Sequence, residues 1–291
     1  MKKAIIKTGT LFLAISFFAI SASTASAQQS KHMENEVKSG YAPVNGIQMY
    51  YEIHGRDGVP LVLIHGGGST IESSWANMLP LLSAHGQVIA LELQAHGRTT
   101  DRDAPESFEQ DADDIAALLK YLGVGKANFF GFSNGGTTTL QLAIRHPQLV
   151  NKIVDLAGSY QREGFVPGFF DGFKGATLDN VPKRLQDAFL KVTPDKSRLQ
   201  VMFEKDVARM VNFKDIPDEA IRSITAPTMI IVGDQDVMPV AHAVKISRMI
   251  QGAHLMVLPG AHGACIGEMG VNAGSKVPAA TAAFIEDFLQ Q

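Results

Sequence analysis

The chain has 291 residues, of which 45% are hydrophobic and 19% are charged, and its formal net charge is -3. This composition is that of a globular protein and excludes a disordered, collagen-like or coiled-coil chain. Lys and Arg do not cluster, so we expect no nucleic acid as a partner, because phosphate binding needs grouped cations. The single cysteine, Cys265, permits no intrachain disulfide, so the fold depends on its hydrophobic core.

Residues 1–27 have the layout of a secretory signal peptide. Lysines open the segment, residues 11–20 form a short apolar run, and the small side chains of residues 25–27 suit a cleavage site. An uncleaved membrane anchor is the alternative, but the apolar run is short for a helix that spans a bilayer. We therefore predict export to the periplasm or the medium, without stable membrane insertion after cleavage, and a flexible lead-in over residues 28–39.

Short apolar runs in the rest of the chain predict strands that are buried in a sheet. They follow a hairpin over residues 41–54 that turns at Asn45-Gly46, and they cover residues 60–64, 87–91, 127–130, 152–156, 229–232 and 255–258. Helical spacing of apolar side chains lies between them, over residues 107–122 (opened by a capping box at Ser107 and Gln110), 134–146, 240–250 and 279–289. The alternation predicts an α/β fold with a mostly parallel central sheet that is flanked by helices.

Residues 158–223 interrupt this alternation. They contain no good strand, and residues 183–192 and 198–213 have helical patterns. Apolar side chains fall on one face of the second helix: Leu199, Met202, Phe203, Val207, Met210 and Val211. We therefore predict a single domain over residues 40–291 with a helical cap inserted at residues 158–223.

Four aromatic residues stand at the start of this predicted cap: Phe165, Phe169, Phe170 and Phe173. They can attach the cap to the core, and they can also line an apolar pocket for a substrate. Both roles are compatible with the sequence. We take Phe165, Phe169 and Phe170 as candidate substrate contacts.

The strongest chemical signal is Gly131-Phe132-Ser133-Asn134-Gly135, which matches G-x-S-x-G. It lies between a predicted strand and a predicted helix, which is the context in which this motif presents a nucleophile. The serine sits on a sharp turn, so its neighbours must lack bulky side chains. The turn also directs the free N–H groups of a helix N-terminus towards the reacting centre. Ser133 is therefore the predicted nucleophile.

A glycine loop, His65-Gly66-Gly67-Gly68-Ser69, follows the strand that ends at residue 64. Glycines allow backbone N–H groups to approach a substrate oxygen closely. An oxyanion hole needs two such donors. We assign them to the N–H groups of Gly67 and of Asn134, the residue after the nucleophile, and we expect His65 to hold the loop. A flexible loop without this role is the alternative.

The base and its orienting acid are expected after the last two strands. Asp236 lies in Gly233-Asp234-Gln235-Asp236, and His262 follows the final strand. The order Ser133, Asp236, His262 is the order in which α/β-hydrolases carry their triad. Asp234 is an alternative acid, although it suits the shaping of the turn. Asp155, at the end of the fourth buried strand, is another alternative.

On these motifs the chain, from Gly40 to its C-terminus, resembles the α/β-hydrolase fold family, specifically the capped serine hydrolases of the carboxylesterase type. The resemblance implies that the acid is the second aspartate of G-D-x-D, here Asp236. Residues 94–99 are similar to the family's G-H-G-x-S loop, but Ala95 and Thr99 replace the first glycine and the serine. Glu92 stands where an aspartate is common. These departures do not affect the predicted triad.

A serine nucleophile excludes haloalkane dehalogenases and epoxide hydrolases, which have Asp at this turn, and dienelactone hydrolases, which have Cys. We expect hydrolysis of a carboxylic ester of a small to medium, partly apolar acid through an acyl-enzyme. Lactonase, thioesterase, amidase or peptidase, C–C hydrolase and haloperoxidase remain alternatives within the fold. A binding protein on a hydrolase scaffold is the alternative from another class. We expect a small-molecule substrate, no metal and no cofactor; the oligomeric state stays open.

Overall fold

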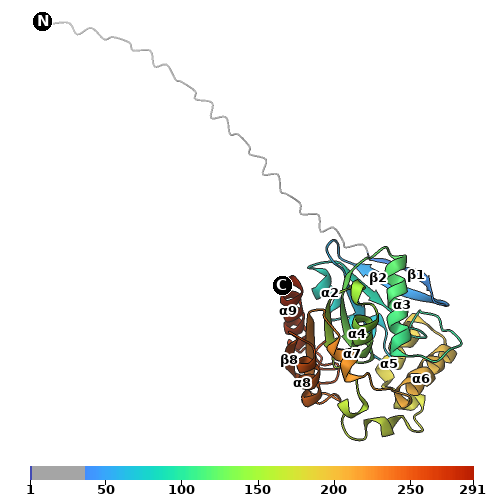
Figure 1. Ribbon diagram of the computed structural model, residues 1–291. Coiled ribbons are helices and arrows are strands. Elements are labelled where there is room, and N and C mark those ends of the chain that lie inside the picture. The colour runs from blue at the N-terminus through green and yellow to red at the C-terminus, as the bar shows by residue number, and fades with distance from the viewer. Residues whose placement is uncertain (2–36) are drawn as a thin grey trace. The chain divides into compact units, whose positions relative to one another are not determined.

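A computed structural model describes Met1 and residues 37–291, so the predicted signal peptide and most of the predicted lead-in lie outside the described residues. Within them, an 8-stranded sheet has the order β1-β2-β4-β3-β5-β6-β7-β8 (Figure 1). β1 pairs with β2, and β2 with β4, in antiparallel fashion; the remaining neighbours are parallel. The predicted α/β class with a mostly parallel sheet is confirmed.

Each strand expected from the sequence is present. The bounds are β1 (Lys38–Val44), β2 (Ile47–His54), β3 (Leu61–Ile64), β4 (Val88–Leu91), β5 (Ala127–Phe132), β6 (Val150–Leu156), β7 (Thr228–Gln235) and β8 (His254–Ala261). β3, β4 and β5 are buried along their whole length, which explains their continuous apolar sequences. Asn45 and Gly46 connect β1 to β2 at φ values of 43° and 88°, as a tight hairpin turn requires.

The predicted boundary of the lead-in at residue 39 is wrong, because β1 already begins at Lys38. Lys38 pairs with Ile53, and Ser39 with Glu52, across the antiparallel ladder. Both side chains are exposed, so their polarity carries no signal of the pairing, which backbone hydrogen bonds provide. The ordered sheet therefore starts two residues before the predicted domain.

The four helices predicted between strands are α3 (Phe108–Tyr121), α4 (Asn134–Arg145), α8 (Val240–Met249) and α9 (Val277–Gln290). Ser107 caps α3 by accepting the N–H of Gln110. The Gln110 side chain donates to Asp114 and does not accept the N–H of Ser107, so only half of the predicted capping box forms. Short helices α1 (Ile71–Trp75), α2 (Leu79–Ser83) and α7 (Asp218–Arg222) were not predicted, because five residues carry too little periodicity.

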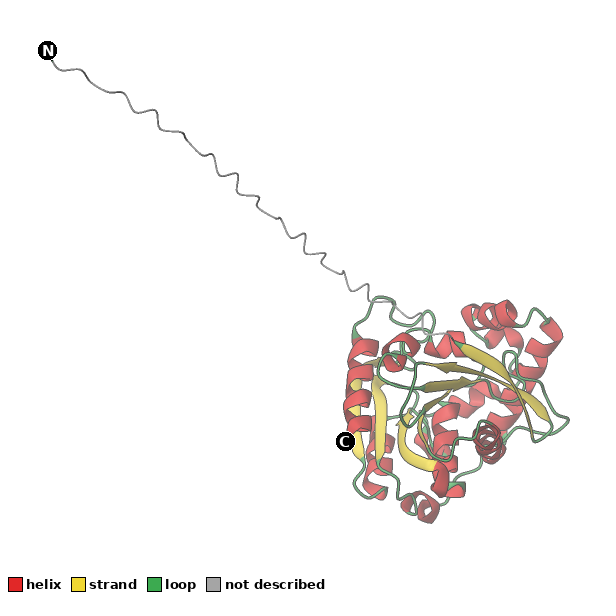
Figure 2. Ribbon diagram, turned by 90° about the horizontal axis from the view of Figure 1, so that it is seen from above, coloured by secondary structure: helices red, strands yellow, loops and turns green. Residues whose placement is uncertain are grey.

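These helices cover the sheet in layers. α3 packs against α4, α4 against α7 and α7 against α8, whereas α2 packs against α9. Figure 2 shows helices on both sides of the strands. The core between the layers includes Trp75, which lies edge-on to Phe130 of β5 at 4.9 Å between ring centroids. In the described part of the chain, no helix has the length and apolar character that crossing a membrane requires.

Between β6 and β7 the described chain contains helices and 3₁₀ turns but no strand. α5 (Lys183–Val192) has the predicted bounds, and α6 (Lys196–Val211) starts and ends two residues before the predicted ones. The two helices pack against each other (Figure 1). Most of the apolar face predicted for α6 is buried, but Val211, the last residue of the helix, is 47% exposed. We refer to residues 158–223 as the cap.

The strand order brings the predicted chemical segments together. The chain moves from β3 outward to β4 and then returns to β5 on the other side of β3, so the order reverses between β3 and β5. Loops that leave the carboxyl ends of strands at such a point diverge and leave a crevice for a ligand. Ile64 pairs with Gly131 at this edge, and Gln235 pairs with Ala261 at the ends of β7 and β8.

Candidate active site

Ser133 stands on a strained turn between β5 and α4. Its φ of 57° and ψ of -119° lie outside the regions that a side chain ordinarily permits. A Cβ at Gly131 would lie 2.0 Å from the carbonyl oxygen of Gly135, and one at Gly135 would lie 2.1 Å from that of Ile64. Glycine at both motif positions is therefore a steric requirement of the turn. Strain of this kind, about 1–3 kcal/mol, persists only where the surrounding structure holds it.

Ser133, His262 and Asp236 are brought into one hydrogen-bonded chain. The Nε2 atom of His262 lies 3.0 Å from the Oγ of Ser133, and its Nδ1 atom lies 2.7 Å from the Oδ1 of Asp236. Asp236 is 8% exposed, and its carboxylate also accepts the N–H of Met238. This is the spacing at which a base can take the serine proton while the acid fixes its tautomer.

The pKa of His262 is raised above its ordinary value of 6.5. Burial opposes the charged imidazolium, but the hydrogen bond and charge of Asp236, together with the nearby charge of Glu268, outweigh it. The site is therefore prepared to hold the proton that His262 would take from Ser133. Glu268 is a second carboxyl group beside the imidazole that the sequence motifs did not indicate; it accepts the hydroxyl of Ser69 at 3.2 Å.

The alternative acids lie elsewhere. Asp155 accepts the N–H of Gly158 at 2.8 Å, and burial raises the pKa of its carboxyl to about 8, so it is neutral at pH 7. Asp234 is exposed and accepts the N–H of Gly260 at 2.8 Å, which shapes the turn. Cys265 is buried, and burial raises the pKa of its thiol to about 12. Only Asp236 contacts the imidazole of His262 among these groups.

The glycine loop lies directly against the serine turn. A Cβ at Gly66 would come within 3.2 Å of the Phe132 ring and the Cβ of Ser133, and one at Gly67 within 2.6 Å of the Nδ2 of Asn134. Among the hydrogen bonds of the described residues, none uses the N–H of Gly67. The N–H of Asn134, at the first position of α4, has no carbonyl available within its helix. Both predicted oxyanion donors therefore remain available to a ligand.

His65 fixes the start of this loop through two hydrogen bonds of its ring. The Nε2 of His65 accepts the N–H of Leu93 at 3.0 Å, so Nδ1 carries the proton and donates to the Gly66 carbonyl at 2.7 Å. Burial and the neighbouring charge of His96 lower the pKa of His65 to about 3. It is therefore a neutral structural side chain and not a proton carrier.

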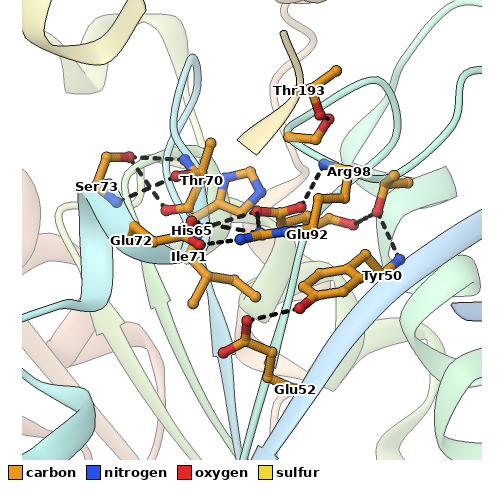
Figure 3. A network of polar contacts seen from close by, with 12 residues as sticks. Tyr50, Glu52, His65, Thr70, Ile71, Glu72, Ser73, Glu92, Arg98 and Thr193 are labelled. Carbon is orange, nitrogen blue, oxygen red and sulfur yellow. Dashed lines mark hydrogen bonds and ion pairs between the residues drawn. The ribbon is translucent and has the colours of Figure 1, made fainter. Parts of the chain in front are cut away.

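A buried carboxylate connects the loops behind the site (Figure 3). Glu92 accepts the N–H and the guanidinium of Arg98 at 2.6 and 2.7 Å, and the N–H of Ile71 at 3.4 Å. Burial raises its pKa to about 7, against the lowering effect of Arg98. A Cβ at Gly97 would lie 2.4 Å from this carboxylate, so the second glycine of the G-H-G-x-S-like segment is required. Glu92 thus occupies the place where the family commonly has aspartate and makes a structural ion pair there.

A cavity of about 390 Å³ opens above Ser133 and beneath the cap. Its walls come from the glycine loop, the serine turn, α5, α6 and the segment before α5, and they are mainly apolar. The apolar lining side chains are Phe169, Phe173, Ala176, Val181, Pro182, Leu185, Met202, Phe203, Val207, Met210 and Val237. The polar groups at its base are Ser133, Asn134, Asp206 and His262. The cavity lining includes no Lys or Arg of the described residues.

The aromatic cluster of the cap divides between two roles. Phe169 and Phe173 line the cavity. Phe165 and Phe170 do not line it, and both lie against Phe213. Phe165 also stacks on Phe169, with 4.4 Å between the ring centroids. Of the three candidate substrate contacts, only Phe169 lines the cavity, so substrate contact stays a prediction for that residue. The other two pack behind it.

Asp206 is the cavity residue that sequence reasoning did not identify. It lies four residues after Met202 and four before Met210, so it interrupts the apolar face of α6 with a carboxylate. A charged residue at such a position is the signal that could have indicated it. In the described residues no group of three or more His, Cys, Asp or Glu side chains is arranged to hold a metal ion.

Comparison with known proteins finds relatives among hydrolases. The family model described as alpha/beta hydrolase fold matches residues 59–217. The 2-hydroxy-6-oxo-6-(2'-aminophenyl)hexa-2,4-dienoic acid hydrolase of Metapseudomonas resinovorans is 27% identical over 258 residues, which cover 80% of this chain and 87% of that protein. Serine hydrolase BPHL of Homo sapiens is 27% identical over 240 residues, which cover 77% of this chain and 79% of that protein.

Solved structures are also similar to this chain. The crystal structure of a serine hydrolase involved in carbazole degradation matches with a TM-score of 0.71 and 24% identity, covering 87% of this chain and 99% of that one. At this identity the likeness shows the fold. The family match extends over more than half of the chain and includes the serine turn and the glycine loop. The chain therefore belongs to the alpha/beta hydrolase fold family and is a hydrolase of that fold.

Proposed function

We propose that the protein is an exported serine esterase that cleaves uncharged carboxylic esters with an apolar acyl group. The observation that carries this proposal is the chain from Ser133 through His262 to Asp236, with contacts of 3.0 and 2.7 Å, at the base of an apolar cavity. The export part rests on the signal-like sequence of residues 1–27. The ester part rests on the chemistry of the cavity.

In the proposed reaction the Oγ of Ser133 attacks the ester carbonyl while His262 takes its proton. The carbonyl oxygen becomes an oxyanion, which accepts hydrogen bonds from the N–H groups of Gly67 and Asn134. Each such donor contributes about 10²- to 10³-fold to the rate. His262 then returns the proton to the leaving alcohol and an acyl-enzyme remains. A water molecule, deprotonated by His262, attacks the acyl carbonyl and releases the carboxylic acid and Ser133.

The cavity favours an uncharged acyl group. Its walls are mainly apolar, and no Lys or Arg of the described residues lines it, so a substrate carboxylate would be buried without a cationic partner. Among the described lining residues the one carboxylate is Asp206, which offers an anionic substrate no hydrogen-bond donor. The name of the Metapseudomonas relative describes hydrolysis of a dienoic acid. For this chain we therefore favour neutral esters over C–C cleavage of such acids.

A matched pair of substrates tests this preference. Five-carbon p-nitrophenyl pentanoate and the p-nitrophenyl monoester of glutarate differ only in a terminal carboxylate. We expect the pentanoate to be cleaved with the higher kcat/KM, because the glutarate chain brings a charge into the apolar cavity. A lactone, an amide and a dienoic acid, assayed in parallel, compare the other bond types. Equal or better cleavage of the glutarate ester would refute the proposed acyl specificity.

The nucleophile has an internal control. Ser159 also lies 3.0 Å from a histidine, His242, but it is 1% exposed and does not line the cavity. We expect Ser133→Ala to abolish ester turnover and labelling by a fluorophosphonate probe, and Ser159→Ala to retain both. If folded wild-type protein neither cleaves the esters nor reacts with the probe, the enzyme proposal fails and a binding role becomes the better explanation.

A further inference from the structure

Asp206 joins the cap to the glycine loop. It lies on α6, yet its Oδ2 accepts the N–H of Gly68 at 2.5 Å and lies 3.0 Å from the Nε2 of His96. Its Oδ1 accepts the guanidinium of Arg209 and is 3.5 Å from the Nδ2 of Asn134. Both carboxylate oxygens are therefore committed to protein groups. Asp206 is thus not available as a free anion for a substrate.

The cations that face Asp206 hold it in the charged form. Burial disfavours the carboxylate, but His96 and Arg209 outweigh this effect and lower the pKa of Asp206. His96 is fully buried; its Nδ1 donates to the carbonyl of Gln94 at 2.8 Å, which leaves Nε2–H for Asp206. Burial disfavours the imidazolium, but Asp206 raises the pKa of His96 to about 9. An ion triad therefore lies directly behind the glycine loop.

Arg209 anchors this triad to the core. Its guanidinium donates to Asp111 of α3 at 2.7 Å and lies 3.1 Å from Glu106, just before α3. Burial raises the pKa of Glu106 to about 7 and that of Asp111 to about 6. Asp206 is consequently fixed from the core side as well as from the cap. The contacts of Arg209 with Asp111 and Glu106 therefore restrict where the Asp206 carboxylate can lie.

The loop needs such an external contact. Residues 66–68 are three successive glycines, and Gly68 has a φ of 67°. Glycines have more backbone freedom than other residues, so the loop does not define its own conformation. An oxyanion donor is effective only if it is already oriented before the reaction. The bond from Gly68 to Asp206 fixes the peptide unit next to Gly67, where a Cβ would lie 3.2 Å from the Asp206 Oδ2.

We propose that Asp206 is a positioning residue for the oxyanion hole: by accepting the Gly68 N–H from the cap, it holds the Gly67 N–H towards the substrate carbonyl. The cap then does more than enclose the substrate, since one of its side chains orders the group that stabilises the transition state. This inference rests on the proposed esterase function. The two can fail separately, because ester turnover by the wild-type protein tests the function and the variants below test the role of Asp206.

The first experiment compares Asp206→Asn and Asp206→Ala with Glu204→Gln, an exposed carboxylate on the same helix that contacts only Gln200 in the described structure. Asparagine keeps an acceptor for the Gly68 N–H, and alanine does not. We expect kcat for p-nitrophenyl pentanoate to fall about 100-fold in the alanine variant, at the lower end of the range for a lost oxyanion donor, and only about 10-fold in the asparagine variant. KM should change little, and Glu204→Gln should behave as wild type.

A transition-state mimic separates positioning from general damage. An alkylboronic acid forms a tetrahedral adduct with the serine and places an oxygen in the oxyanion hole. We expect its inhibition constant to rise in proportion to the loss of kcat in both variants. An unchanged kcat overturns the proposal. So does a rise in KM alone, an equal effect of asparagine and alanine, or an unchanged affinity for the boronic acid.

The pH dependence of kcat in the wild-type protein tests the same proposal without relying on the folding of a variant. The charged groups around His96 are Asp206 and Arg209 from α6 and Glu106 from the segment before α3. The rings of His96 and His65 also lie together, with 4.9 Å between their centroids. The Nε2 of His96 also lies 3.2 Å from the Gly68 nitrogen. When His96 loses its proton, this atom stops donating to Asp206 and competes with it for the Gly68 N–H, so the anchor through Asp206 weakens. We expect kcat to decline as pH rises through about 9 while the protein remains folded by circular dichroism. A kcat that stays level up to pH values above this range overturns the proposal.

Discussion

Replacing Asp236 by asparagine should inactivate the enzyme while leaving its fold intact. The Nδ1 of His262 lies 2.7 Å from the Oδ1 of Asp236, so in the wild type Nδ1 carries the proton and Nε2 is free to accept one from Ser133. The asparagine amide can donate to Nδ1, which moves the ring proton to Nε2. In that tautomer His262 cannot act as a base. We expect kcat to fall about 10⁴-fold, as for other triads, which corresponds to about 5.5 kcal/mol.

The pH profile provides a second signature of the same change. The base must be neutral, so activity is present above the pKa of His262 and is lost as pH falls through it. In the wild type Asp236 raises this pKa above 6.5, and in Asp236→Asn that contribution disappears while burial continues to lower it. The acid limb of the residual kcat/KM should therefore move to lower pH. A stopped assay with p-nitrophenyl pentanoate from pH 5 to 8 measures both effects.

Two isosteric variants are the controls. Asp234→Asn keeps an acceptor for the Gly260 N–H, and Asp155→Asn replaces a carboxyl group that is already neutral at pH 7. Both should retain kcat close to that of the wild type. If Asp236→Asn keeps most of the activity, or if Asp155→Asn or Asp234→Asn loses it, then the acid has been assigned to the wrong residue.

Two other variants test the core and the cavity. Burial raises the pKa of Asp155 from its ordinary value of 3.8 to about 8. Between these values the unfolded chain has lost the proton that the folded protein keeps, so the free energy of unfolding should decrease as pH rises. The slope is up to about 1.4 kcal/mol for each pH unit. Asp155→Asn should reduce this slope, as measured by urea unfolding at pH 5 and 8; an unchanged slope would show that Asp155 is ionised in the fold. Val207→Phe should narrow the cavity and shift preference from octanoate to acetate esters, whereas Ala208→Phe, exposed on the same helix, should not. Equal chain-length profiles for the two would remove α6 from the acyl site.

Local patterns in the sequence were sufficient to predict the sheet and the serine turn. Continuous apolar runs mark β3, β4 and β5 because both faces of these strands are buried. Gly131 and Gly135 can be read without a structure, because the turn that presents a nucleophile excludes a Cβ at both positions. The boundary at Lys38 was missed because pairing at a polar sheet edge leaves no apolar pattern.

The contacts between distant segments were decided only by the tertiary structure. The sequence left three aspartates as possible acids, and the packing of β7 against β8 brings only Asp236 to His262. It left the aromatic residues of the cap in two possible roles, and the fold turns Phe169 towards the cavity while Phe170 packs behind it.

Asp206 shows most clearly that the sequence does not reveal contacts between distant segments. Its place on the apolar face of α6 is visible in the sequence, but its partners, Gly68 and His96, are 138 and 110 residues away along the chain. Helical periodicity specifies which side of a helix faces inward, because it depends on neighbours within one or two turns. Which loop that side meets depends on how the whole chain folds back on itself. The sequence thus determined the catalytic residue types and their order, and the tertiary structure determined which cap residue meets the glycine loop.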